Sequence, residues 1–154
     1  MPSRESESAL ERALREHEEL QRLIRELRSF LEKLRPPLGD PGCHTWAASL
    51  SKHVARLHDM IFRHFRDEEQ EGLFENLARR HPGAREKVSS LRQEHSAILA
   101  AIREMMSATL RYSEGQPLRD PRLRHRMIEL LDAIARHEQN ESELIVQIEY
   151  SDPL

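Results

Sequence analysis

The stretch IARHEQNESELI, residues 134–145, decides how this chain folds, because it places polar side chains on an otherwise apolar helical face. Stepping outward from it by alternating intervals of three and four residues gives a seam that is apolar except for one imidazole and one carboxylate: Leu123, Met127, Leu130, Ile134, His137, Glu141, Leu144 and Ile148. Such spacing is typical of the buried face of an amphipathic helix. The sequence therefore predicts a core-facing helix that buries His137 and Glu141.

Residues that break or cap helices divide the chain into four long segments. The expected helices span residues 5–34, 45–80, 84–112 and 120–150. Their limits are set by prolines and capping residues, in chain order Pro36 and Pro37, the N-cap candidate Thr45, Pro82, and the pair Asp120 and Pro121. Four helices of this length joined by short loops predict an all-α fold, an antiparallel up-down-up-down four-helix bundle, in a single domain over residues 1–154.

The other three segments carry the same kind of seam, and each is interrupted by a histidine. His17 interrupts the first seam, His64 and Glu68 the second, and His95 the third. Counted from the expected loops at a rise of about 1.5 Å per residue, these groups fall at similar heights along the bundle as His137 and Glu141. We expect all six polar side chains to meet in one layer of the core.

A weak internal repeat relates the two halves of the chain. EHEELQRLIRE, residues 16–26, shares its frame with EHSAILAAIRE, residues 94–104, and RHFRDE, residues 63–68, shares R-H-x-x-x-E with RHEQNE, residues 136–141. A twofold axis between the halves would supply the same donor atoms to two neighbouring positions. This arrangement predicts a dinuclear metal site.

The donor types narrow the choice of metal. Buried carboxylates beside imidazoles in an apolar core cost several kcal/mol unless their charge is compensated, and two cations supply that compensation. His and Glu four residues apart share a helix face, so each pair offers a nitrogen to one ion and a carboxylate between both. A nitrogen and oxygen set without thiolates favours iron, with manganese second, whereas a structural zinc site takes four ligands around one ion.

At these residues the sequence resembles the hemerythrin-like (HHE cation-binding) domains. The resemblance covers nearly the whole chain and rests on the order H…H-x-x-x-E…H…H-x-x-x-E, formed here by His17, His64, Glu68, His95, His137 and Glu141. It implies that these six residues hold two iron ions with an oxo or hydroxo bridge. A member of this family would handle oxygen, peroxide, nitric oxide or iron itself.

Two departures from the classical oxygen-carrying members argue against reversible oxygen carriage. This chain has Leu91 where those proteins have a further histidine, and Glu141 where they have an aspartate. Loss of the fifth histidine makes the two ions nearly symmetric and leaves more coordination positions open. We therefore expect a centre that reacts with or senses a small ligand and, if it is an enzyme, a di-iron oxidoreductase acting on peroxide or oxygen, with no catalytic residues beyond the metal ligands.

Two other function classes remain open. An iron-sensing or iron-buffering regulatory module would bind metal without turnover, and a metal-free or zinc-containing helical protein would act through protein interactions. Metal-dependent folding or partner binding without loss of peroxide distinguishes the sensor from a reactive centre. The metal content of the protein distinguishes both from the interaction protein.

Residues near the expected site have secondary roles in this interpretation. Glu16, Glu94 and Glu138 adjoin metal-ligand histidines and are candidates for outer partners of the imidazole N–H groups. Phe65 and Ile61 flank His64 and are candidates to line an access pocket. The remaining histidines are interpreted as loop or surface residues: His44, His53, His58, His81 and His125.

Composition excludes several partners. The 24 Lys and Arg residues are interspersed with 27 Asp and Glu, without the basic stripe that nucleic-acid binding requires. No apolar run approaches the roughly 18 residues of a membrane span, and the first 20 residues have no apolar core of a secretory signal. The single cysteine fits a reducing cytoplasm. The expected partner is a small diatomic molecule or peroxide.

Overall fold

The computed structural model describes residues 8–33, 42–70, 72–114 and 122–149. These residues form, in chain order, α1 (Ala9–Lys33), α2 (Gly42–Gln70), α3 (Leu73–Arg80), the short 3-10 helix η2 (Pro82–Ala84), α4 (Arg85–Ser113) and α5 (Leu123–Glu149). The described ranges contain no strand, which confirms the predicted all-α class. Among the helices of these ranges, none has the length and apolar character needed to cross a membrane.

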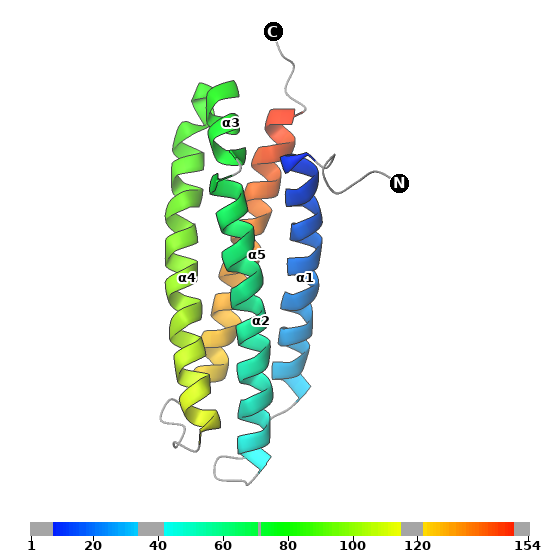
Figure 1. Ribbon diagram of the computed structural model, residues 1–154, viewed down its shortest axis with the longest axis vertical. Coiled ribbons are helices and arrows are strands. Elements are labelled where there is room, and N and C mark those ends of the chain that lie inside the picture. The colour runs from blue at the N-terminus through cyan, green and yellow to red at the C-terminus, as the bar shows by residue number, and fades with distance from the viewer. Residues whose placement is uncertain (1–7, 34–41, 71, 115–121, 150–154) are drawn as a thin grey trace.

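The four long helices lie side by side along the long axis of the molecule (Figure 1). α2 packs against α1 and α4, and α5 packs against α4 and α1, so the four helices surround a common interior. The colour gradient in Figure 1 shows that successive long helices run in opposite directions. This arrangement brings residues from both halves of the chain to the same height.

The predicted second helix is broken, which corrects the expectation of one helix over residues 45–80. α2 ends at Gln70 and α3 begins at Leu73, and between them Gly72 has φ of 85°. Glycine adopts this left-handed conformation without the steric penalty of a Cβ atom. The break turns α3 so that Leu73, Phe74 and Leu77 are buried at the end of the bundle.

The other predicted helix limits agree with the structure to different degrees. α2 begins at Gly42, so Thr45 lies within its first turn and is not the N-cap that the sequence suggested. Pro82 is the first residue of η2, as its fixed φ favours. The predicted breaks at residues 36–37 and 120–121 lie outside the described residues.

The buried apolar residues form two large clusters with a polar layer between them. Leu20, Ile98 and Ile134 belong to the larger cluster, whereas Ala13 and Leu91 belong to the cluster that α3 covers. His17, His95 and His137 lie between these levels on their helices and are themselves buried. The apolar clusters above and below therefore exclude bulk water from this layer.

Candidate metal centre

All six predicted site residues come together in the buried layer, and a seventh joins them. Each of the seven is at most 3% exposed: His17, His64, Glu68, His95, His137, Glu138 and Glu141. They come from all four long helices. The heights inferred from counting residues along the helices were therefore correct.

One group of donor atoms surrounds the histidines of α1 and α2. His17 Nε2 lies 2.7 Å from Glu138 Oε2 and 2.9 Å from Glu141 Oε1. His64 Nε2 lies 2.9 Å from Glu68 Oε1 and 3.3 Å from Glu138 Oε2. These five residues offer ligand atoms that all lie within 4.8 Å of one another.

A second group surrounds the histidines of α4 and α5. His137 Nε2 lies 3.3 Å from Glu141 Oε2, and His95 Nε2 lies 3.9 Å from the same oxygen. Glu68 Oε1 also lies 3.9 Å from His95 Nε2. Glu141 thus belongs to both groups, with one oxygen facing each, and Glu68 lies between them as well.

The outer nitrogen of every histidine in the layer has a partner on another helix. His64 Nδ1 lies 2.6 Å from Glu16 Oε2, and His137 Nδ1 lies 2.9 Å from Glu94 Oε2. His95 Nδ1 is 3.3 Å from Glu69 Oε1, and His17 Nδ1 is 2.9 Å from Ser142 Oγ. A carboxylate oxygen accepts, so in a neutral imidazole Nδ1 donates and the lone pair of Nε2 faces the interior.

These contacts test the expected outer partners. Glu16 and Glu94 do hold imidazoles, although each holds the histidine of the next long helix and not its own sequence neighbour. Glu69 and Ser142 were missed, and the signal for both was a position five residues after a seam histidine. Side-chain reach between helices, which spacing along one helix does not encode, decides these pairs.

Glu138 was expected outside the layer but lies inside it. The seam of α5 passes from Ile134 to Glu141, and steps of four then three make Glu138 as good an inward residue as His137. In the structure both side chains are 1% exposed. The signal was present in the spacing and was overlooked because one seam residue per turn was assumed.

Burial and mutual proximity shift the pKa values of these groups. Burial alone would lower the pKa of His17, but the adjacent carboxylates of Glu138 and Glu141 outweigh it and raise the pKa to about 9. Burial also opposes the raised pKa values of His64 and His137, which their glutamate partners cause. In the metal-free layer His17 therefore holds its second proton at neutral pH.

The pKa values of the two central carboxyl groups, Glu68 and Glu141, are shifted in opposite directions. Burial and the neighbouring charge of Glu141 raise the pKa of Glu68 well above its ordinary value. Burial acts in the same direction on Glu141, but the adjacent side chains of Glu68, His137 and His17 hold its pKa well below the ordinary value. The two central glutamates thus have pKa values shifted in opposite directions in the metal-free protein.

Several buried atoms of the layer lack hydrogen-bond partners, which tests whether the residues fit a metal. In the described part of the chain these atoms include Nε2 of His64, His95 and His137, both oxygens of Glu68 and of Glu138, and Oε2 of Glu141. Buried polar atoms are normally paired because an unpaired one costs free energy. Donors of one coordination sphere lie about 3 Å apart when each is about 2.1 Å from the ion. The nitrogen and oxygen set fits iron or manganese.

Aromatic rings enclose the histidines of α4 and α5. Phe65 stacks on His95 with ring centroids 3.7 Å apart, and its centroid lies 5.2 Å from that of His137. Phe74 of α3 lies 5.1 Å from His95. Phe65 was expected to flank an access pocket, and the structure places it directly against this histidine pair.

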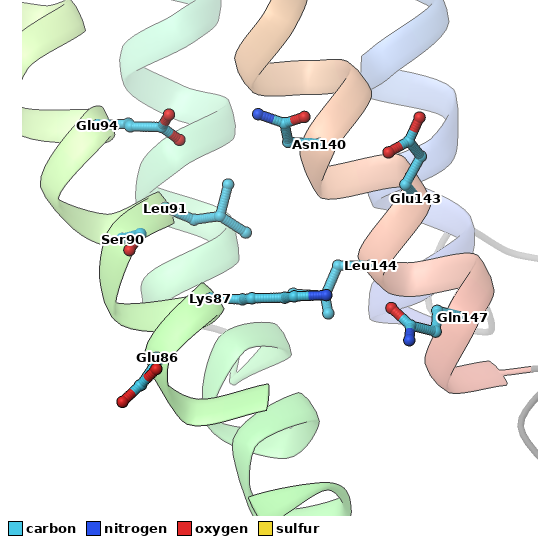
Figure 2. Close-up of a pocket in the computed structure, with 9 residues that line it drawn as sticks. All are labelled: Glu86, Lys87, Ser90, Leu91, Glu94, Asn140, Glu143, Leu144 and Gln147. Carbon is cyan, nitrogen blue, oxygen red and sulfur yellow. The ribbon is translucent and has the colours of Figure 1, made fainter. Parts of the chain in front are cut away.

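A surface groove of about 420 Å³ lies between α4 and α5 next to this pair. Figure 2 shows Glu94 and Leu91 of α4 facing Asn140 and Leu144 of α5 across the groove. Leu91 is one helical turn from His95, and Glu94 accepts the hydrogen bond from His137 Nδ1. The groove therefore reaches the side chain that holds the outer nitrogen of His137.

The histidines interpreted as surface residues take no part in the donor groups of the described chain. His53 packs against Phe30 with centroids 4.8 Å apart, far along α2 from His64. His58 pairs with Asp59, and His125 pairs with Glu129 at the surface. His44 has no described side chain. His53 is only partly exposed, and it belongs to neither donor group.

Metal binding is expected to strengthen as the pH rises from about 6 to about 8 and to release protons. The pKa of His17 is raised to about 9, so its proton must leave when a metal binds at neutral pH. Below that pKa each displaced proton changes the apparent affinity by up to about tenfold per pH unit. Titration of ferrous iron without oxygen, with an indicator dye in weak buffer, measures both effects. Equal affinities at the two pH values would contradict the expectation.

The raised pKa of His17 makes the metal-free fold less stable as the pH rises, whereas metal binding strengthens as the pH rises. Folded His17 holds its proton more tightly than an imidazole of ordinary pKa 6.5 does. Its contribution to stability is therefore complete below about pH 6.5 and is lost as the pH rises through about 9. Metal then replaces the protons as the compensating charge.

Comparison with known proteins agrees with this geometry. A family model described as the hemerythrin HHE cation binding domain matches residues 8–148, a span that contains all seven residues of the layer. No curated protein and no solved structure matches the chain. The family match covers far more than half of the 154 residues. The chain belongs to the hemerythrin HHE cation-binding family.

Proposed function

We propose that this protein is a non-heme di-iron protein that handles a small ligand such as oxygen, peroxide or nitric oxide, on an antiparallel up-down-up-down bundle in one domain. One observation carries the proposal: two pairs of buried histidines flank two glutamates, and inward-facing nitrogens of both pairs lack hydrogen-bond partners. Each pair is close enough to hold one ion. The single cysteine of the chain supports a cytoplasmic location.

Each histidine pair would bind one of the two ions. His17 and His64 would hold one iron, His95 and His137 would hold the other, and Glu68 with Glu141 would lie between both. Bound iron supplies redox chemistry toward oxygen, peroxide or nitric oxide. Glu16 and Glu94 accept from the outer nitrogens and fix the tautomer and orientation of their imidazoles.

The apolar surroundings support a reactive or sensing role over reversible oxygen carriage. Leu91 stands one turn from His95, where it supplies no donor, so positions at the ion held by the second histidine pair are left for an exogenous ligand. Phe65 and Phe74 cover His95 and exclude water from it. A small uncharged or singly charged ligand suits such a space.

Iron sensing or buffering without turnover is the second candidate. The donors come from all four long helices, so metal occupancy would couple every helix of the bundle. Such coupling gives a regulatory module a means to change shape or stability with iron supply. The same site serves either role, and turnover separates them.

Metal analysis of protein produced with iron, joined to visible spectra with and without peroxide, tests the proposal. The donor count of the two histidine pairs predicts about two irons per chain. An oxo bridge between them would give a charge-transfer band in the near ultraviolet. Zinc alone, or no metal, would refute the di-iron function. Consumption of peroxide separates the reactive centre from the sensor, which would leave peroxide unchanged.

A further inference from the structure

The two halves of the internal repeat make equivalent contacts around the candidate metal centre. Glu16 precedes His17 and holds His64, and Glu94 precedes His95 and holds His137 in the same way. Ser142 and Glu69, each five residues after the histidine of its own helix, hold the remaining imidazoles. The two halves therefore build their histidine pairs by the same rule, as a twofold relation requires.

The relation fails at one inward-facing position. In the aligned frames R-H-F-R-D-E and R-H-E-Q-N-E, Phe65 corresponds to Glu138. Both side chains are buried and reach the histidine pair of the opposite half. Glu138 Oε2 lies 2.7 Å from His17 Nε2, whereas the ring of Phe65 stacks on His95. One pair thus receives a carboxylate and the other receives a hydrocarbon ring.

We propose that Glu138 is a further metal ligand, so that the two ion positions are unlike. The position at His17 and His64 is completed by protein donors, and the position at His95 and His137 keeps the open site for the exogenous ligand. This inference rests on the proposed metal-binding function. It assigns to Glu138 a role that the six-residue pattern of the family lacks.

The donor count around each pair supports this difference. Glu138 Oε2 lies within 3.3 Å of both His17 Nε2 and His64 Nε2, where it is placed to share an ion with them. Both oxygens of Glu138 are buried without hydrogen-bond partners. Around the inward nitrogen of His95, Nε2, the carboxylate oxygens of Glu68 and Glu141 lie 3.9 Å away. The first position therefore has more donors and more negative charge.

The surroundings of the second position suit an incoming ligand. Phe65 occupies the place that a third carboxylate fills at the first position, and it provides an apolar wall without a competing donor. The groove between α4 and α5 lies on this side, with Leu91 and Leu144 on its inner wall (Figure 2). The groove and the proposed open coordination position thus lie on the same half of the site, the half formed by α4 and α5.

The substitution Glu138→Gln tests the proposal because it keeps side-chain size and removes the charge. In wild-type protein loaded with ⁵⁷Fe we expect two Mössbauer doublets of equal area, of which added azide shifts one. In the variant we expect a competing chelator to remove one of the two irons roughly 10–100-fold more readily. This is the range by which metal affinity falls when a supporting side chain is lost. Azide should still shift the Mössbauer signal of the iron that remains at His95 and His137.

Matched variants separate this inference from the proposed function. Glu129→Gln removes an exposed carboxylate of the same helix, away from the groove, and should leave both doublets and both release rates unchanged. Phe65→Leu should alter only the azide-sensitive doublet. Wild-type protein that binds two irons but gives a single doublet, or a Glu138→Gln variant identical to wild type, overturns the inference alone. Failure of the wild type to bind iron overturns the function and the inference together.

Discussion

Replacing Glu141 with alanine should remove both metal ions from the protein. Its two oxygens face different histidine pairs, with Oε1 2.9 Å from His17 Nε2 and Oε2 3.3 Å from His137 Nε2. No other side chain of the described layer belongs to both donor groups. The substitution would leave the imidazoles without the charge that links the two positions, so we expect metal content to fall from about two irons per chain to well below one.

Metal analysis after gel filtration in chelator-free buffer measures this loss. Glu68→Ala should also release metal, because Glu68 lies 2.9 Å from His64 and 3.9 Å from His95. His53→Ala and His125→Ala are matched controls outside the donor groups and should keep both irons. Full retention of iron in the Glu141 and Glu68 variants would refute the assignment of the central glutamates as ligands.

Removing the metal should lower the melting temperature of the protein by at least about 10 °C. Ligand present at about 1,000 times its dissociation constant stabilises the folded state by about 4 kcal/mol per site, and one kcal/mol shifts the melting point of a domain of this size by roughly 2–4 °C. Three carboxyl groups and four imidazoles then remain buried with only protons as compensating charge. The polar layer crosses all four long helices, so its loss affects the whole bundle.

Thermal unfolding followed by circular dichroism, with iron-loaded and chelated samples, measures the shift. The His125→Ala variant should show the same difference between the two samples as the wild type, because that side chain pairs with Glu129 at the surface. Glu141→Ala should unfold at the same temperature with and without iron. Identical melting points for loaded and chelated wild-type protein would show that the layer is stable without metal.

The two histidine pairs have different surroundings, so the two ends of the centre are not equivalent. The pair of α1 and α2 is surrounded by three glutamates, whereas the pair of α4 and α5 is covered by Phe65 and Phe74. In the proposed centre, the first surroundings would retain a cation tightly and the second would admit a small ligand. A near-symmetric site, as the sequence suggested after the loss of the fifth histidine, would have made no such distinction.

Periodicity made the histidine layer predictable. A helix repeats every 3.6 residues, so polar residues that interrupt an apolar seam must lie in the core, and counting from the loops places them at one height. His17, His95 and the two H-x-x-x-E pairs were found in this way, and all are buried together. The proline at residue 82 likewise marked the turn before α4.

Local signals failed where two neighbouring positions were equally compatible with the pattern. His137 and Glu138 both fit steps of three and four from Ile134, and only the rotation of α5 against the other helices places both inside. No break within residues 45–80 was predicted either, yet Gly72, with φ of 85°, is the N-cap of α3. Packing of the neighbouring helices selects the outcome for Glu138, and the left-handed backbone of glycine permits the break at residue 72.

The amino-acid sequence by itself determined the helical class, the depth of the polar layer and the chemical nature of its donors, because these depend on spacing along single helices. Tertiary structure decided which glutamate reaches which histidine: Glu16 and Glu69 hold imidazoles of other helices, and Glu138 turns inward. Contacts between helices depend on their relative rotation and distance. Those quantities arise when all four seams pack at once, and no segment specifies them alone.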